Sequence, residues 1–384
     1  MIYNFDEIIK RRTSDSIKWN LFDEDVIPLW VADTDFVSPK PVIDLLVDRV
    51  QHGVFGYGLP PRELTETICQ RLLNLYNWKV ELDEVVYLPG VVVGFNNVIH
   101  AFTEPNQKVL IQTPVYNPFL YAPKNAKAIC IDVPLIKDDN NNYFIDFDEF
   151  DNKIDTQTAL FLFCNPHNPV GRVYSVEELS RISEICLNHN IPICSDEIHC
   201  DLIYHGHQHI PIASLDQEIA QNSITLMSPS KTFNIAGLGS SFAIVQNPRY
   251  RKLLEKAQQG LVSHVNILGS QAALAAYKEG SDWLNQLMQY LTKNRDFLEN
   301  YVNQNFPGVK ITKIEGTYLA WLDFNALNLP ENPYEFFLKI AKVALTDGEI
   351  YGSGGKGFVR LNFGCPKSVL LHALDRMKAA LSEL

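Results

Sequence analysis

The sequence reads TALFLFCNPHNPVG at residues 158–171, IPICSDEIH at 191–199 and SITLMSPSK at 223–231. Each stretch opens with a short apolar run of the kind that forms buried strands, and each then turns polar. EVVYLP at 84–89 and KVLIQ at 108–112 are two further runs of this kind. These five runs are expected to be strands of one sheet.

The segment VEELSRISEICLNHN at 176–190 spaces its apolar residues at helical intervals and follows Ser175, a residue type that caps helices. It lies between two of the predicted strands. Strand, helix and strand in alternation predict an α/β fold with a mostly parallel sheet and helices on both faces.

After about residue 280 the sequence pattern changes. An amphipathic helix is predicted over 282–301, followed by strands in TYLAWLDF and GFVRLNF. We expect a large domain at 46–280 and a smaller α+β domain at 281–384, which residues 1–45 join.

Composition narrows the classes of function. The chain has 384 residues, is 46% hydrophobic and 20% charged, and carries a net charge of −12. With no dense run of Lys and Arg, a nucleic-acid partner is not expected. The start lacks the apolar core of a signal peptide, and no apolar run is long enough for a membrane span. Seven cysteines without close CxxC pairs favour a reducing compartment, so we expect a cytoplasmic protein without a membrane partner.

Polar residues follow four of the predicted strands. Asn168, Asp196 and the SPSK segment come after three of them, and Gly90 ends the fourth and opens a helical stretch. Open α/β sheets bind ligands at the carboxyl ends of their strands. These residues are therefore expected to line one crevice.

The residues in this crevice match the needs of pyridoxal 5′-phosphate (PLP). Its aldehyde needs an amine, which Lys231 can supply, and its ring nitrogen needs a carboxylate such as Asp196 to stay protonated. Asn168 can donate to the phenolic oxygen, and Tyr116 can stack on the ring. Hydroxyls and helix-start amides suit the phosphate, and the candidates are Ser228, Ser230, Gly90, Val91 and Val92.

NPHNPVG, SDEIH and SPSK, in this order and spacing, resemble the fold-type-I PLP enzymes of the class I/II aminotransferase superfamily. More narrowly, PLWVADTDF (28–36), VFGYG (54–58), SKTFNIAGL and GTYLAW resemble the MalY/PatB-type cystathionine β-lyases, which are C–S lyases. The resemblance implies a homodimer that cleaves cystathionine or cysteine-type thioethers by β-elimination to a thiol, pyruvate and ammonia.

The same resemblance implies a role for each matching residue. Lys231 would be the Schiff-base lysine and the base, Asp196 the ring-nitrogen partner, and Arg360 the fork for the substrate's α-carboxylate. Tyr57 would reach the cofactor phosphate and the substrate in the neighbouring subunit, and Ala32 would lie against the substrate.

Two positions depart from the broad aminotransferase pattern. His199 stands where many of those enzymes have a Tyr, and Gly239 stands where many have a phosphate-binding Arg. Both departures resemble the lyase branch. They leave open what neutralises the phosphate, and His199 is equally well a ring contact or a satisfied histidine.

Other interpretations stay open at this point. An aminotransferase on the same scaffold, or a PLP-binding regulator without turnover, would share most of these motifs. Asp196 and Asn168 suit ordinary turns, Tyr57 suits a packed aromatic, and Arg360 could form a structural ion pair. The histidines of YHGHQHIP (204–211) suggest a zinc site, but a solvated loop without a metal is expected there. The glycines of GSGGKG (352–357) suggest a phosphate site, but a flexible turn is expected.

Overall fold

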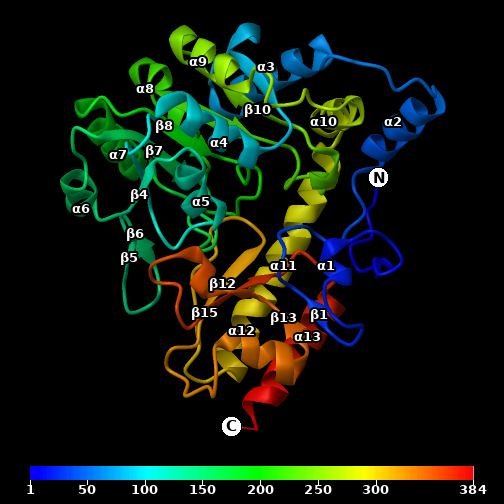
Figure 1. Cartoon of the computed structure of the whole chain (residues 1–384). Coiled ribbons are helices and arrows are strands. Elements are labelled where there is room, and N and C mark those ends of the chain that lie inside the picture. The colour runs from blue at the N-terminus through cyan, green and yellow to red at the C-terminus, as the bar shows by residue number, and fades with distance from the viewer. Residues whose placement is uncertain (384) are drawn as a thin grey trace.

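A computed structural model describes residues 1–383 of the chain (Figure 1). Its main feature is a seven-stranded sheet in the order β2-β10-β9-β8-β7-β3-β4. All neighbouring pairs are parallel except those of β10, which runs antiparallel to both β2 and β9. The strands are β2 (Val85–Leu88), β3 (Lys108–Ile111), β4 (Ile129–Asp132), β7 (Thr158–Cys164), β8 (Ile193–Asp196), β9 (Ser223–Met227) and β10 (Ser241–Ile244). The α/β fold with a mostly parallel sheet is confirmed.

Helices cover both faces of this sheet, because alternate residues of a strand point to opposite faces. In β7, Leu160 and Leu162 join the cluster formed with α4 (Val91–Phe102), α5 (Pro118–Asn125) and α9 (Pro248–Gln258), whereas Phe161 and Phe163 pack beneath α7 (Val176–Asn188). Helix α7 begins at the predicted cap, where Ser175 and Glu178 accept hydrogen bonds from each other's backbone amides at 3.3 and 2.9 Å. Helices α3 (Arg62–Tyr76) and α10 (Ile267–Glu279) pack at the β9–β10 side.

A second, antiparallel sheet follows the long helix α11 (Ser281–Asn305). Its order is β11-β12-β15-β14, and α12 (Pro333–Phe336) and α13 (Lys367–Leu381) complete this part of the chain. Its strands are β11 (Lys310–Ile311), β12 (Leu319–Asp323), β14 (Thr346–Asp347) and β15 (Phe358–Asn362). In Figure 1, α11 runs from the large sheet toward the lower part of the molecule.

The N-terminal segment packs on this second part. Strand β1 (Ile27–Pro28) pairs in parallel with β13 (Val343–Ala344), and the Asn362 side-chain amide donates to the carbonyls of Val31 and Asp33, both at 2.6 Å. Figure 1 shows this blue segment beside the red C-terminal helix. These contacts agree with the proposal that residues 1–45 join a small domain, but the domain boundaries stay a prediction.

The remaining short elements connect the larger ones. They include α1 (Ile17–Asn20), α2 (Lys40–Gln51), β5 (Ile136–Lys137), β6 (Tyr143–Phe144), α6 (Phe147–Asn152), the turn helix η2 (Ile212–Ser214) and α8 (Gln217–Gln221). Within residues 1–383, no helix is both long and apolar enough to cross a membrane.

Candidate active site

A pocket of about 410 Å³ lies at the carboxyl ends of the sheet strands. Its walls come from the loops after β7, β8 and β9, from the start of α4, and from β15 and the N-terminal segment. The predicted residues that line it are Ala32, Gly90, Val91, Val92, Tyr116, Asn168, Asp196, His199, Ser230, Lys231 and Arg360. Trp30, which also lines the pocket, and Arg360 are 330 positions apart in the chain and meet here.

Lys231 projects into this pocket from the loop that follows β9. Its amine donates a hydrogen bond to the carbonyl oxygen of Ala32 at 2.6 Å, and the Tyr318 hydroxyl donates to the same oxygen at 3.0 Å. Burial, followed by the charge of Arg360, lowers the pKa of Lys231 to about 8. Roughly a tenth of this amine is therefore neutral at pH 7, far more than for an ordinary lysine, and the neutral form is the one that a nucleophile or a base requires.

Asp196 is the last residue of β8 and is almost fully buried. Its Oδ1 accepts a hydrogen bond from the Ile198 amide at 3.1 Å, which orients the carboxylate. Burial raises the pKa of Asp196 to about 7, and the charge of Lys231 works in the opposite direction. A cation brought against this carboxylate would keep it ionised, which is what a protonated ring nitrogen would do.

Arg360 lies in β15 and is buried without an acidic partner among residues 1–383. Its two terminal nitrogens donate to Asn168 Oδ1 at 3.1 Å and to the Trp30 carbonyl at 2.7 Å, and Nε has no partner there. A buried cation usually has an anion beside it. The pocket is therefore suited to a ligand carboxylate.

Asn168 lies in the loop after β7 and Tyr116 in the loop after β3, and a backbone hydrogen bond joins them. The Tyr116 amide donates to the Asn168 carbonyl at 3.0 Å. Because Asn168 Oδ1 already accepts from Arg360, its amide nitrogen is the group left to donate to a ligand. Across the pocket, Gly90 precedes the first turn of α4, whose Val91 and Val92 amides lack helical partners.

His199 and the two serines differ in how far they reach the pocket. His199 is buried with no partner for Nδ1 among the described residues, and burial lowers its pKa to about 3, so the ring is neutral. Ser230 lines the pocket, whereas Ser228 lies behind it and donates its hydroxyl to the Ser240 carbonyl at 2.7 Å. Ser228 therefore stabilises the loop that follows β9.

Tyr57 is not brought to this pocket by its own chain. Its side chain is fully exposed and lines a separate hollow with neighbouring residues 55–59 and with residues 263–268. This placement is compatible with a role in another subunit, which stays a prediction.

Gly239 occupies a backbone conformation that explains why no arginine stands there. Its φ is +56°, and a Cβ at this position would lie 3.2 Å from the Pro89 carbonyl oxygen. A side chain would be strained in this geometry. The source of charge for a bound phosphate must therefore lie elsewhere.

Several pocket residues were not predicted from the sequence. Trp30, Val31, Thr346, Ile350 and Tyr351 line the pocket from the N-terminal segment and from the chain that precedes β15. Trp30 and Val31 fall inside the PLWVADTDF motif, which was the one available hint. The other three arrive only through the packing of the second sheet.

The histidine-rich segment is a solvated loop only in part: His205, Gly206 and Gln208 are exposed, as expected. His209 is buried, and its Nε2 lies 2.8 Å from Glu197 Oε2. The interpretation was wrong for this residue because burial of a loop depends on contacts with distant parts of the chain.

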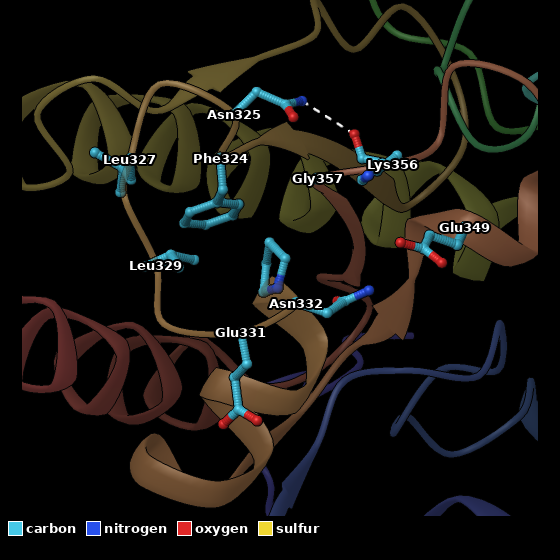
Figure 2. Close-up of a pocket in the computed structure, with 10 residues that line it drawn as sticks. Phe324, Asn325, Leu327, Leu329, Glu331, Asn332, Glu349, Lys356 and Gly357 are labelled. Carbon is cyan, nitrogen blue, oxygen red and sulfur yellow. Dashed lines mark hydrogen bonds between the residues drawn. The ribbon is translucent and has the colours of Figure 1, made fainter.

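A second pocket lies beside the small sheet and has none of the predicted site residues (Figure 2). It measures about 280 Å³, and the Asn325 amide there donates to the Lys356 carbonyl at 3.1 Å. Figure 2 shows Phe324, Leu327 and Leu329 on one side and the carboxylates of Glu331 and Glu349 apart from each other. The chemistry expected from the sequence belongs to the first pocket.

The first pocket fits PLP by the chemistry of its side chains. It offers an amine with a lowered pKa, a buried carboxylate, a tyrosine ring and two unpartnered buried nitrogens, Arg360 Nε and His199 Nδ1. The amine suits an aldehyde, the carboxylate and the tyrosine ring suit a cationic aromatic ring, and the two nitrogens suit an anionic amino-acid ligand.

Comparisons with known proteins agree with this reading. The family model "Aminotransferase class I and II" matches residues 24–377. Cystathionine beta-lyase PatB of Bacillus subtilis is 40% identical, with 99% of this chain and 100% of that protein covered. Protein MalY of Escherichia coli is 30% identical, with 96% of both chains covered.

Comparisons with solved structures indicate the same family. Cystalysin from Treponema denticola, which contains PLP, superposes with a TM-score of 0.96 at 36% identity and full coverage of both chains. The PLP-bound C–S lyase from Staphylococcus hominis has a TM-score of 0.93 at 34% identity, with 99% of both chains covered. The chain therefore belongs to the class I and II aminotransferase family, and within it to the group of PatB- and MalY-type cystathionine β-lyases.

Proposed function

We propose that this protein is a PLP-dependent C–S β-lyase that acts on cystathionine or on cysteine-type thioethers. In the overall reaction one C–S bond is cleaved and one water molecule is consumed, and a thiol, pyruvate and ammonium form. The observation that carries the proposal is the meeting of Lys231, Asp196 and Arg360 in one pocket. Full-length similarity to cystathionine β-lyases supports it.

The cofactor would be held by residues on four loops. Lys231 would anchor its aldehyde, Asp196 would face the ring nitrogen, and Tyr116 would lie on the ring. Asn168, Ser230 and the first amides of α4 would donate to its oxygens. When bound, PLP supplies an electron sink that stabilises the negative charge left on the substrate's α-carbon.

Arg360 would orient the substrate. Its guanidinium is buried and forms no ion pair with an acidic residue in residues 1–383. Hydrogen bonds to Asn168 and to the Trp30 carbonyl fix its orientation. A guanidinium in this state binds a carboxylate through two parallel hydrogen bonds. Holding the α-carboxylate there would fix the α-carbon near Lys231.

Lys231 would then remove the proton from the α-carbon. The neutral amine has a lone pair for this step, and the lowered pKa makes the neutral form accessible. The Ala32 carbonyl, which accepts a hydrogen bond from this amine at 2.6 Å, would hold it in place. Loss of the thiolate from the β-carbon follows, since thiols are acidic enough to leave as anions.

A homodimer with shared active sites is the proposed assembly. Phe55, Tyr57 and Leu59 form an exposed apolar surface on one segment, and Tyr57 is fully exposed in the single chain. Exposed apolar patches of this kind commonly mark interfaces. The proposed location is the cytoplasm, which cell fractionation would check.

The function is tested by incubating the purified holoenzyme with L-cystathionine, L-cysteine or L-methionine, without any keto acid. We expect pyruvate from the first two substrates and none from methionine, whose sulfur is attached one carbon too far for β-elimination. Lys231→Ala should lower the rate by at least about 10²-fold, the lower range for loss of a general base. Lys10→Ala, at an exposed position, serves as the control.

Two results would overturn the proposal. Amino-group transfer that requires an added keto acid, with no release of pyruvate from cystathionine, would indicate an aminotransferase. Undiminished turnover in Lys231→Ala would exclude the assigned role of this lysine.

A further inference from the structure

Glu197 is the residue directly after Asp196, and its side chain is fully buried. Its carboxylate accepts three hydrogen bonds, from Ser195 Oγ at 2.9 Å, from the Ile212 amide at 3.1 Å, and through its contact with His209 Nε2 at 2.8 Å. A carboxylate held by several donors favours its ionised form. A buried carboxylate is thus held one residue along the chain from Asp196.

The contact with His209 is part of a buried layer under the site. The His209 ring packs edge-on against Tyr76 with ring centroids 5.7 Å apart, and its Nδ1 has no partner among the described residues. No lysine or arginine in residues 1–383 lies within 4.0 Å of the Glu197 carboxylate. Among these residues, only His209 could offset its charge from contact distance, and His209 carries a charge only when it is protonated.

Other ionisable groups near the two carboxylates stay neutral. Burial raises the pKa of each of these side chains, which are Tyr116, Cys164 and Cys194 near Asp196, and Tyr76 and Cys200 near Glu197. Burial also keeps His199 neutral.

Two further sets of charged groups lie near the carboxylates. Lys231 faces Asp196. The Arg71–Asp201 ion pair lies beside Tyr76 and Cys200, and its two charges offset each other.

We propose that Glu197 is a positioning residue that acts through its charge on Asp196 and strengthens the hold of that pair on the proton of the cofactor's ring nitrogen. The proposal rests on the proposed role of Asp196 as the ring-nitrogen partner. A second negative charge close by makes a cationic ring more favourable in the low-dielectric interior. In agreement, Glu197 adds to the effect of burial in raising the pKa of Asp196.

The test uses the holoenzyme loaded with PLP that carries ¹⁵N at the ring nitrogen. The ¹⁵N chemical shift reports whether this nitrogen is protonated, and a pH titration gives the pH at which it loses its proton. We expect Glu197→Gln, which keeps the volume and removes the charge, to lower that pH by about one unit, the usual size of a neighbouring-charge effect.

Two further variants separate charge from contacts. Glu315→Gln is the matched control, because Glu315 also accepts hydrogen bonds, from Arg172 Nε at 3.1 Å and the Val173 amide at 3.0 Å, yet it does not line the site pocket. It should leave the ring-nitrogen titration unchanged. Glu197→Asp keeps the charge and disturbs the contacts, so it should lower the free energy of unfolding while its titration stays near that of the wild type.

The outcomes distinguish this inference from the proposed function. A wild-type ring nitrogen that is unprotonated at neutral pH would refute the role of Asp196. A protonated wild type with an identical titration in Glu197→Gln would refute only the role of Glu197. If Glu197→Gln does not fold, a downward shift of about one unit in Glu197→Asp would still overturn the proposal, because the charge is retained there.

Discussion

Arg360 is the side chain whose surroundings say most about what the pocket binds. It is a buried cation whose partners in residues 1–383 are an amide, a hydroxyl and a backbone carbonyl. Such a group is costly to bury unless an anion completes its surroundings. The pocket is therefore shaped for a ligand that brings its own carboxylate.

Arg360→Lys should weaken substrate binding strongly. An ammonium offers a single point of charge where the guanidinium offers a planar fork, so we expect kcat/KM for L-cystathionine to fall about 100-fold, mainly through KM. Steady-state kinetics measure this effect. The control is Arg62→Lys, whose side chain is exposed on α3 and should change neither constant. An unchanged KM in Arg360→Lys would contradict the assignment.

The pKa of Lys231 predicts how fast the apoprotein takes up PLP. Only the neutral amine attacks an aldehyde, and burial lowers the pKa of Lys231 from 10.5 to about 8. Covalent attachment of PLP should therefore accelerate as pH rises toward 8 and level off above it. Stopped-flow absorbance measures this rate. A rate that still rises tenfold per pH unit between 9 and 10 would show an unshifted lysine, since about 10.4 is the usual value.

Single residues also show what the sequence could reveal of the site. Lys231, Asp196 and Asn168 were predictable because each lies at the end of an apolar strand or within four residues of it, and strand ends meet at one edge of a parallel sheet. Glu197 and His209 were not, because their burial depends on the return of the 209–214 loop onto β8. Local sequence does not record that packing.

At the scale of elements, the strands differ in how plainly the sequence marks them. Residues 159–164 are all apolar because β7 is buried on both faces from Leu160 onward, and this made the strand predictable. Strand β10 has only four residues and runs antiparallel, and it was not foreseen. Strand β1 pairs with β13, so that Ile27 lies beside Val343. No sequence pattern within either segment predicts a partner so far away in the chain.

The N-terminal segment is fixed beneath the site by a buried ion cluster. Lys18 in α1 is fully buried, and its amine lies 2.8 Å from Asp35 Oδ2, while Arg11 reaches Asp35 Oδ1 at 2.6 Å. Although burial acts to raise the pKa of Asp35, the charge of Lys18 holds it below its usual value. This cluster anchors the chain whose Ala32 carbonyl holds Lys231.

Lys18→Met should destabilise the protein by about 3–5 kcal/mol, because it leaves a buried carboxylate without its main partner. Lys40→Met is the matched control, since Lys40 forms an exposed pair with Asp44 on α2 and should cost no more than about 1 kcal/mol. Urea unfolding of both apoproteins measures the difference. Equal free energies of unfolding would show that the cluster contributes no more than a surface pair.

At the scale of the whole molecule, one chain leaves part of its apolar surface uncovered. Tyr57 is fully exposed, and Leu59 is 80% exposed on the same segment. This segment borders a hollow with residues 263–268, away from the pocket that contains Lys231. A second copy of the chain would cover this surface and could bring Tyr57 to the neighbouring site, which is the arrangement we propose.

Hybrid dimers test the sharing of sites. If Tyr57 serves the neighbouring subunit, Tyr57→Ala and Lys231→Ala should each be nearly inactive alone. A hybrid of the two has one site with both residues intact, because the Lys231 of one subunit meets the Tyr57 of the other. Equal amounts, unfolded and refolded together, should therefore recover about a quarter of wild-type activity, since half of the dimers are hybrids with one complete site. If each residue serves its own subunit, no mixture gains activity, and the shared site is excluded.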